Sequence, residues 1–461
     1  MNLDQLIYPE SIAVVGASHD ATRISGRPLP MLRGHGYPGR VYPVNPRHDR
    51  LQGYKCYARL ADLPEVPDLV MVMIGAQHVP GILRESVELG VRWVIVYSSG
   101  FNESSGGRER AILLQEIVRG TSTHFLGPNT EGLMDFSAGI PLGFSPVIDP
   151  ERGYRESLEP HSTVILSQSG GVGFSLYEWC RKFGLGVRTV VSTGNELDVE
   201  VTDFIAAYGL REGVENIVLF LEGLRDPQRF VNEVRRVRAR GVGVFALRIG
   251  TLPAGRRSAP AHTGKPPASA DLNAVLAKDG VVIESDLEIL LARLKGLTDG
   301  PSRGGCRVGI LSTSGGAGIW ASDWVERFGL KVPELSQDLQ QKLSQNLPSF
   351  AALANPVDVT AQASFAGGLD VSLQTLMDSD EIDGVLFIAN FGFNQRLIKD
   401  PGFSRVLRER TKPVAVFSYS PPSKEASGFF RRLGVPLFSS PRQAAAAMSS
   451  LLQAAPRSRA F

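Results

Sequence analysis

The chain has 461 residues, of which 43% are hydrophobic and 21% are charged. This length predicts two to four domains at roughly 150 residues each, and this composition is that of a folded globular protein and argues against a disordered one. The formal net charge of +2 is spread along the chain, which excludes nucleic acid as a partner attracted by overall charge.

The sequence contains no recognisable targeting signal, membrane span or cysteine-based metal motif. No apolar run reaches the ~18 residues of a membrane span, and the first residues, MNLDQLIYPE, lack the pattern of a signal peptide. We therefore expect a cytoplasmic protein without membrane contact. Cys56, Cys180 and Cys306 are far apart in the sequence, so their spacing predicts neither a disulfide framework nor a metal site.

Three segments each begin with an apolar strand that runs into a glycine-rich turn, as at the opening of a βαβ unit. Apolar strands and helical stretches then alternate after each opening, which predicts parallel sheets covered on both faces. The fold class we expect is α/β with three doubly wound parallel-sheet domains, a Rossmann-like domain followed by two flavodoxin-like domains. The openings are SIAVVGAS from Ser11, STVILSQSGGVG from Ser162 and RVGILSTSGGAG from Arg307.

The second and third segments resemble each other without a gap. ILSQSGGVGFSLYEWCRKFGLGV from Ile165 aligns with ILSTSGGAGIWASDWVERFGLKV from Ile310, an offset of 310 − 165 = 145 residues. This match indicates an internal duplication. Polar, Gly- and Pro-rich stretches at 149–162 and 297–306 are typical of linkers. The domains we expect span residues 1–150, 160–298 and 304–455.

Loops of the first segment suggest a nucleotide site at the carboxyl ends of its strands. Gly16 and Gly26 bracket the loop after the first strand, and glycine lets a backbone approach a phosphate. Asn45 and Arg47 follow the second strand, where an NAD-binding domain would carry an acidic residue; an arginine suits a phosphorylated nucleotide better. YSSGFNE and GPNTEG follow later strands, although such loops are often purely structural.

The motif SQSGGVGF in the second segment predicts an anion site. Ser167, Ser169, Gly170 and Gly171 stand where a helix should begin, so backbone N–H groups and hydroxyls would converge on a bound anion. STSGGAGI at 312–319 has the same chemistry. After a duplication one copy can serve as scaffold only, and we expect the first copy to be functional.

Two further residues could act on such an anion. Glu222 ends the apolar strand NIVLFLEG, and a carboxylate there can accept an imidazole N–H and raise its basicity; a solvated charge is equally compatible with the pattern. His262 lies in the small-residue loop APAHTGK. A neutral imidazole can take a phosphoryl group when a carboxylate and an anion-binding helix are adjacent, although a lone histidine is more often structural or exposed.

Taken together, the motifs resemble a known family. YPVNPR, SSGF and GPN, then LSQSGGVG, STGNELDVEVTD, LEG and AHTG, then STSGGAG and NPVDVT are similar to the alpha part of NDP-forming acyl-CoA synthetases, relatives of the succinyl-CoA synthetase alpha subunit. The resemblance implies a CoA-binding domain and two succinyl-CoA-ligase-like flavodoxin domains. It also implies that an acyl phosphate passes its phosphate to a histidine and its acyl group to CoA, and that the phosphohistidine charges ADP or GDP.

The resemblance assigns roles to individual residues. His262 matches the phosphorylated histidine, and Glu222 matches the carboxylate that holds it. The helix start that faces the phosphate matches Ser167, Ser169 and Gly170. The residues expected around CoA are Gly16, Ser18, Asn45, Arg47, Ser98, Gly100 and Asn129, and those expected near the acyl group are Gly194 and Asn195.

The sequence departs from the family pattern in two loops. Lys265 and Pro266 follow the histidine motif in place of small apolar residues, and Thr130 and Glu131 replace the usual Cys and Leu after Asn129. These departures bear on acyl specificity, and the altered loop after His262 motivates an alternative function, a CoA- or acyl-CoA-binding sensor or scaffold. An NAD-dependent oxidoreductase is a third reading of the Rossmann-like start, against which Arg47 counts.

None of the motifs in these 461 residues resembles an ATP-grasp domain. The resemblance therefore implies a separate beta subunit that carries ATP-grasp chemistry, with ADP or GDP and Mg²⁺ bound there, and a homodimer core is compatible with it. The acid, and the choice between ADP and GDP, are left open by the sequence.

Overall fold

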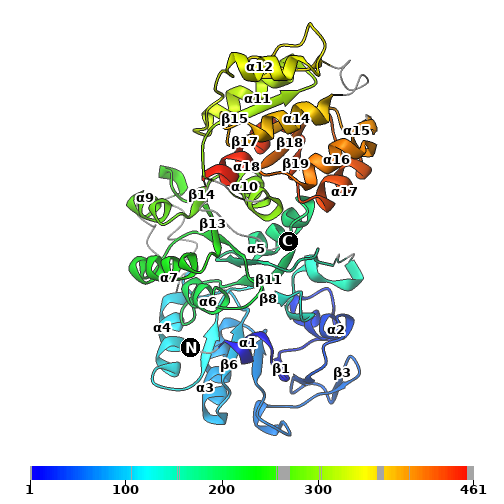
Figure 1. Ribbon diagram of the computed structural model, residues 1–461. Helices are drawn as coiled ribbons and strands as arrows, with labels where there is room; N and C mark the ends of the chain where they lie inside the picture. Colours follow the sequence, from blue (N-terminus) through cyan, green and yellow to red (C-terminus); the bar gives the residue numbers. More distant parts are fainter. Residues whose placement is uncertain are drawn as a thin grey trace. The chain divides into compact units, whose positions relative to one another are not determined.

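A computed structural model describes residues 3–453 apart from 105, 153, 155, 256, 258–269, 301, 303, 361–367 and 394. The chain forms two compact units, Met1–Ser285 and Asp286–Phe461. Each unit is an α/β structure built on parallel strands (Figure 1). Among the described helices, none has the length and apolar character that a membrane crossing would need.

The first sheet of the first unit consists of five parallel strands in the order β2-β1-β5-β6-β7. The strand order reverses beside β1, and loops at such a switch point are where open α/β sheets bind ligands. Helix α2 lies on one flank, and α3 and α4 lie on the other (Figure 1), as right-handed crossovers require. The elements are α1 (Asp4–Ile7), β1 (Ser11–Val15), α2 (Pro28–Gly34), β2 (Arg40–Val44), the small hairpin β3 (Arg50–Leu51) and β4 (Tyr54–Lys55), β5 (Leu69–Val72), α3 (Val79–Leu89), β6 (Trp93–Val96), α4 (Gly107–Val118) and β7 (His124–Leu126).

The second sheet of this unit has seven strands in the order β14-β13-β12-β10-β11-β8-β9. Strands β10 to β14 are parallel, and the apolar runs of β10 to β13 are buried as in a sheet covered on both faces. The elements are β8 (Gly132–Asp135), β9 (Ile140–Gly143), β10 (Thr163–Ser167), α5 (Gly170–Lys182), β11 (Val187–Ser192), α6 (Val201–Tyr208), β12 (Asn216–Leu221), α7 (Pro227–Ala239), β13 (Gly243–Arg248), α9 (Ala270–Lys278) and β14 (Val282–Glu284).

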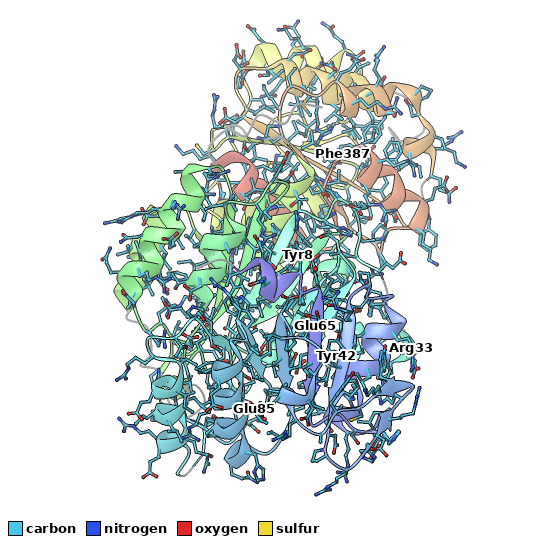
Figure 2. The ribbon with its side chains drawn as sticks, turned by 90° about the horizontal axis from the view of Figure 1, so that it is seen from below. Tyr8, Arg33, Tyr42, Glu65, Glu85 and Phe387 are labelled. Atoms are coloured by element: carbon cyan, nitrogen blue, oxygen red, sulfur yellow. The ribbon has the colours of Figure 1, made fainter. Side chains whose placement is uncertain are left out.

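The hairpin β8–β9 was not foreseen. Its residues fall in the stretch expected to complete the first domain, yet β8 pairs antiparallel with β11 of the second sheet. Asp135, at the end of β8, is fully buried and accepts hydrogen bonds from Thr189 Oγ1 (2.8 Å) and Tyr8 Oη (3.2 Å). Tyr8 is labelled in Figure 2. The hairpin therefore completes the second sheet, and the hydrogen bond from Tyr8 ties the N-terminal residues to it.

The second unit is built on one parallel sheet in the order β16-β15-β17-β18-β19. Its opening repeats that of β10 and α5, because β15 runs into the 13-residue helix α11 just as β10 runs into the 13-residue helix α5. The elements are α10 (Leu287–Asp299), β15 (Val308–Ser312), α11 (Gly315–Arg327), α12 (Gln337–Ser344), β16 (Val357–Asp358), α14 (Leu369–Asp378), β17 (Gly384–Ala389), α15 (Arg396–Lys399), α16 (Pro401–Arg408), β18 (Val414–Ser418), α17 (Lys424–Arg432), β19 (Leu437–Phe438) and α18 (Pro441–Gln453).

Helix α10 packs on α18 within the second unit. A Cβ at Gly296 would lie 2.7 Å from the Ala447 carbonyl oxygen, so only glycine allows this approach of the two helices. Arg293 Nη1 also donates to Ser449 Oγ (3.1 Å). The second domain expected from the sequence, residues 160–298, ends within α10. A helix can belong to one domain and pack on the next, so the domain limits stay predictions.

The ion pair between Asp383 and Arg307 makes the second unit sensitive to acid. Arg307 Nη2 donates to Asp383 Oδ1 (2.7 Å), and the N–H groups of Cys306 and Arg307 donate to Oδ2 (2.9 Å each). The hydrogen bond from the Arg307 guanidinium is the main cause that lowers the pKa of Asp383 from 3.8 to about 2. A carboxyl group whose pKa is lower in the folded state stabilises the fold above its unfolded pKa. That stability is lost as the pH falls from about 4 to 2.

We therefore expect the stability of Asp383→Asn to depend less on pH, in the acidic range, than the stability of the wild type. The thermal unfolding midpoint, measured from pH 5 to pH 2, should fall less steeply for this variant than for the wild type. Asp323→Asn, at an exposed position on α11, is the control and should follow the wild type. If the unfolding midpoints of Asp383→Asn and the wild type fell equally steeply as the pH is lowered, this role of the ion pair would be contradicted.

Candidate active site

The loops after β1 and β2 are held together at the carboxyl edge of the first sheet. Gly16 has φ +85°, and a Cβ there would lie 2.6 Å from Ile74 Cγ2, which explains the glycine. Asn45 Nδ2 donates to the Ala17 carbonyl oxygen (2.9 Å), and Asn45 Oδ1 accepts the N–H of Arg47 (3.1 Å). The predicted CoA residues Gly16, Asn45 and Arg47 therefore lie on two adjoining loops.

Ser18 belongs to the same loop pair. Gln52 Nε2 donates to the carbonyl oxygens of Ser18 (2.9 Å) and Gly26 (3.0 Å). A Cβ at Gly26 would lie 2.0 Å from the Asp20 carbonyl oxygen. The loop between Gly16 and Gly26 is thus folded tightly back on itself, and glycine is required at both ends.

The loops after β6 and β7 carry the other predicted CoA residues. Asn129, with φ +58°, donates its backbone N–H to the Ser98 carbonyl oxygen (3.0 Å). Gly100 donates its N–H to the Glu103 carboxylate and accepts from the Arg110 guanidinium (2.8 Å to Nη2). Ser98, Gly100 and Asn129 are therefore brought together, as expected for neighbouring strand ends.

The predicted CoA loop and the predicted acyl loop are in direct contact. Asn129 Nδ2 donates to Asn195 Oδ1 (3.3 Å), and Asn195 Nδ2 donates to Glu103 Oε2 (2.6 Å). Burial alone would raise the pKa of Glu103, but hydrogen bonds from Asn195 and from backbone N–H groups lower it below its ordinary value. Gly194 has φ +60°, and a Cβ there would lie 2.4 Å from the Pro128 carbonyl oxygen.

The predicted phosphate loop forms the start of α5. Ser167 Oγ donates to the Ser169 carbonyl oxygen (2.6 Å) and accepts the Ser169 N–H (3.1 Å). Ser169 is the N-cap residue of α5, but its side chain makes no capping hydrogen bond. The first N–H groups of the helix are therefore not capped by Ser169, and they offer the partial positive charge that attracts anions.

The second copy has the same local geometry. Ser312 Oγ donates to the Ser314 carbonyl oxygen (2.7 Å) and accepts the Ser314 N–H (3.1 Å). The serine pattern at the helix start therefore does not distinguish the copies. Our preference for the first copy stays a prediction.

An acidic side chain lies at the start of α5, which the sequence did not predict. A Cβ at Gly170 would lie 2.6 Å from Glu131 Cγ. Glu131 Oε2 is buried and has no hydrogen-bond partner among the described residues. Burial raises the pKa of Glu131, whereas a hydrogen bond with Ser145 and the charge of Arg27 oppose that rise. Glu131 is one of the departures from the family pattern, and its carboxyl group lies beside the expected anion position.

Glu222 lies just after β12 and is 6% exposed. Its backbone N–H donates to Gln168 Oε1 (2.7 Å), which ties the end of β12 to the phosphate loop. His262 lies outside the described residues. Its contact with the Glu222 carboxylate and its place before α5 therefore stay predictions.

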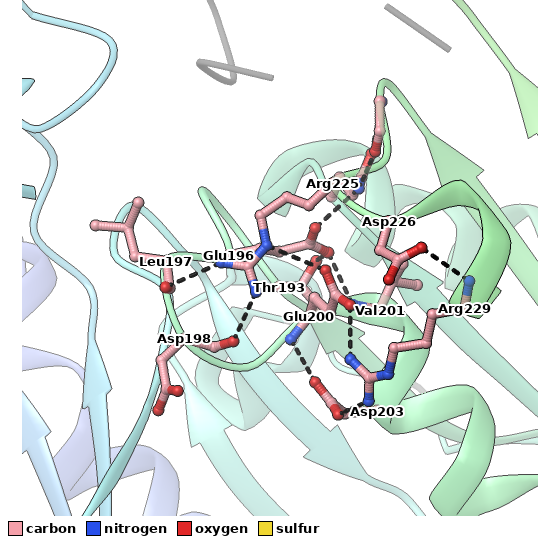
Figure 3. A network of polar contacts seen from close by, with 12 residues as sticks. Thr193, Glu196, Leu197, Asp198, Glu200, Val201, Asp203, Arg225, Asp226 and Arg229 are labelled. Carbon is pink, nitrogen blue, oxygen red and sulfur yellow. Dashed lines mark hydrogen bonds and ion pairs between the residues drawn. The ribbon is translucent and has the colours of Figure 1, made fainter. Parts of the chain in front are cut away.

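Gln168 and Glu196 contact the predicted phosphate and acyl loops, and the sequence reasoning did not single them out. Gln168 is buried inside the SQSGG motif, and Glu196 is buried inside the motif STGNELD. The two side chains are hydrogen-bonded to each other (3.0 Å), and Glu196 is seen within its network in Figure 3. The signal that could have found Gln168 is a long polar side chain shortly after the apolar run of residues 164–166 in β10.

Family models match three parts of the chain. The CoA binding domain matches residues 10–118, the succinyl-CoA ligase like flavodoxin domain matches residues 160–297, and the Ligase-CoA domain matches residues 308–375. These are the domain types, in the order, that the motifs predicted.

Relatives match nearly the whole chain. Acetate–CoA ligase (ADP-forming) II subunit alpha of Pyrococcus furiosus is 29% identical over 98% of this chain and 98% of its own length. Acetate–CoA ligase (ADP-forming) I of Archaeoglobus fulgidus is 29% identical over 97% of this chain, which spans 63% of that longer protein.

A solved structure confirms the expected fold class. The structure of dinucleotide forming Acetyl-coenzyme A synthetase 1 of Ca. Korarchaeum cryptofilum, in complex with phosphate and ADP, matches with a TM-score of 0.84. It is 27% identical, and the match covers 98% of this chain and 96% of that chain. On the strength of the three domain types, the matched lengths and this fold, the chain belongs to the NDP-forming acyl-CoA synthetase family, as a chain of the alpha type.

Proposed function

We propose that the chain is the alpha-type subunit of an NDP-forming acid–CoA ligase, which interconverts acyl-CoA, NDP and phosphate with acid, CoA and NTP. The main support for this proposal is that the three loops predicted to bind CoA, the acyl group and phosphate contact one another directly. Asn129 of the CoA loop bonds to Asn195 of the acyl loop (3.3 Å), and Thr193 beside it donates its N–H to the Ser167 carbonyl oxygen of the phosphate loop (2.8 Å).

In this proposal the residues act in sequence on one phosphoryl group. Phosphate displaces CoA from the acyl-CoA, and the resulting acyl phosphate is held by the N–H groups at the start of α5. His262 attacks the phosphorus as a neutral imidazole, and the acid leaves with the bridging oxygen. Glu222 accepts the other imidazole N–H and so stabilises the positive charge that develops on the ring.

The loops of the first sheet fit CoA. Gly16 leaves room for a backbone approach to phosphate, and Arg47 is exposed at the end of β2, where its guanidinium can reach a phosphate group. Asn45 and Arg47 stand where an NAD enzyme would carry an acidic residue, so the oxidoreductase alternative is not favoured.

We further propose a separate ATP-grasp subunit as the partner that binds ADP or GDP with Mg²⁺, a homodimer core and a cytoplasmic location. The name of the Pyrococcus furiosus relative, a subunit alpha, supports the separate partner. The sensor or scaffold alternative finds no support among the relatives, which are named as ligases.

The proposal is tested by product formation in the two-subunit complex. The chain, purified with an ATP-grasp partner, is given acetyl-CoA, phosphate and ADP or GDP, and NTP formation is measured. We expect NTP to form, and calorimetry to detect binding of CoA but not of NAD. Binding of CoA without NTP formation in an active complex would support the sensor instead, and binding of NAD alone would support the oxidoreductase.

Arg47 offers a specific check on the CoA site. Arg47→Ala should weaken CoA binding at least tenfold, because a charge-assisted contact to phosphate contributes about 1.5–3 kcal/mol and about 1.4 kcal/mol is a factor of ten. Arg84→Ala, at an exposed position on α3, should leave CoA binding unchanged. Equal CoA affinity for Arg47→Ala and the wild type would remove Arg47 from the site.

A further inference from the structure

Gln168 holds the end of β12 through both ends of its side-chain amide. It is 3% exposed, directly after β10. Its Oε1 accepts the N–H groups of Glu222 (2.7 Å) and Gly223 (3.1 Å), and its Nε2 donates to the Gly223 carbonyl oxygen (2.7 Å). With the bond to Glu196 (3.0 Å), these contacts use the two lone pairs and the two amide hydrogens. A side chain of another shape or polarity cannot reproduce this set.

Glu196 is the second partner of that amide, and it is held in an uncommon conformation. Its φ is +55°, and it is only 1% exposed. Its Oε1 accepts from Thr193 Oγ1 (2.6 Å) and from the N–H of Val201 (2.9 Å), while its Oε2 accepts from Gln168. A left-handed residue other than glycine costs about 1 kcal/mol or more and persists only where its surroundings fix it. The buried contacts of the carboxylate supply that fixation (Figure 3).

These bonds close a ring through the candidate active site. Gln168 follows Ser167 in the chain and bonds to Glu196; Glu196 bonds to Thr193, and the Thr193 N–H returns to the Ser167 carbonyl oxygen (2.8 Å). A ring of buried hydrogen bonds resists the displacement of any one member. The phosphate loop, the acyl loop and the end of β12 that carries Glu222 are therefore fixed relative to one another.

We propose that Gln168 and Glu196 are a pair of positioning residues that fix the Glu222 backbone and the acyl loop relative to the start of α5. Neither residue is assigned a contact with substrate. The pair acts through Glu222, whose carboxylate must meet the imidazole in one orientation, and through Asn195, the neighbour of Glu196. This inference rests on the proposed ligase function.

The second copy of the duplicated segment provides a matched control. Position 313 corresponds to position 168 at the offset of 145 residues, and Thr313 stands there after the equivalent strand. Thr313 is 4% exposed, and its N–H donates to the Ile388 carbonyl oxygen (2.9 Å). A threonine is too short to bridge two strand ends as Gln168 does. A substitution at 313 therefore perturbs an equivalent buried position without touching the ring.

The test is a set of substitutions in the complex with the ATP-grasp partner, with NTP formation from acetyl-CoA, phosphate and NDP as the readout. Gln168→Met keeps the length of the side chain but removes its hydrogen bonds, and we expect kcat to fall at least tenfold while KM for acetyl-CoA and the Kd for CoA change less than twofold. Glu196→Gln should lower kcat as well, and Thr313→Val should not.

Exchanging the amide and the carboxylate between positions 168 and 196 distinguishes a positioning role from a general effect on stability. Gln168→Glu alone places a second carboxylate beside Glu196 and should lose more activity than Gln168→Met. In the double variant Gln168→Glu, Glu196→Gln, the amide at position 196 can donate to the carboxylate at position 168. We therefore expect kcat of the double variant to be at least fivefold higher than that of Gln168→Glu. Such recovery is the coupling expected of residues in direct contact.

The outcomes distinguish this inference from the proposed function. If the wild-type complex forms no NTP, the proposed function fails. If the wild type is active and Gln168→Met keeps kcat within twofold, or if the double variant recovers nothing over Gln168→Glu, the positioning role is overturned. Equal losses in kcat and in CoA affinity would also overturn it, because they would mean general damage to the unit.

Discussion

Gly194→Ala is expected to lower the free energy of unfolding by about 2–4 kcal/mol. Gly194 has φ +60°, where an alanine side chain is strained, and its Cβ would lie 2.4 Å from the Pro128 carbonyl oxygen and 2.6 Å from that of Asn129. Both neighbours are backbone atoms, so neither can rotate away. The substitution should therefore separate the acyl loop from the loop after β7.

Gly120→Ala is the matched control for this prediction. Gly120 also has a positive φ, +76°, but a Cβ there meets nothing within 4 Å. Only the backbone preference is lost, which costs about 1 kcal/mol. Urea unfolding of both variants measures the difference. Equal destabilisation would mean that the close approach of the two loops contributes nothing.

Glu131→Gln is expected to tighten binding of inorganic phosphate at least tenfold at neutral pH. The Glu131 side chain lies against Gly170 at the start of α5, the proposed phosphate position. Two like charges about 5 Å apart repel by roughly 3 kcal/mol at an effective dielectric constant of 20. Glutamine keeps the shape of the side chain and removes the charge.

The effect of Glu131→Gln on phosphate affinity should depend on pH. Burial raises the pKa of Glu131 above its ordinary value, so its carboxyl group becomes charged at a higher pH than an exposed one. The advantage of Glu131→Gln should therefore grow as the pH rises and vanish in acid. Phosphate titrations of the wild type, Glu131→Gln and the control Glu178→Gln, farther along α5, measure it. Unchanged or weaker binding by Glu131→Gln would show that its carboxyl group does not oppose the anion.

The sequence predicted most of the fold because its signals are local. Each sheet opens with a continuous apolar strand and a glycine turn, and the duplication repeats the signal at Ile165 and Ile310. The hairpin β8–β9 was missed because its partner β11 lies some 50 residues further along the chain, and no local pattern reports such a pairing.

The site was predicted in part, for a similar reason. Ser98 and Asn129 meet because the ends of β6 and β7 share an edge of one parallel sheet. Asn129 and Asn195 follow strands of different sheets, so their contact depends on how the two sheets of the first unit pack. The role of Gln168 depends on contacts with two loops distant in sequence, so its residue type alone could not reveal it. Glu131 was noticed as a departure, but only the structure places it against α5.

The most direct test of the account is phosphate labelling of His262. The complex with the ATP-grasp partner is incubated with acetyl-CoA and radioactive phosphate, without nucleotide, and the label is mapped by proteolysis. We expect an acid-labile, base-stable label at His262 that disappears in His262→Ala and persists in His161→Ala, a histidine of the same unit. A label that survives in His262→Ala, or that maps to another residue, would contradict it.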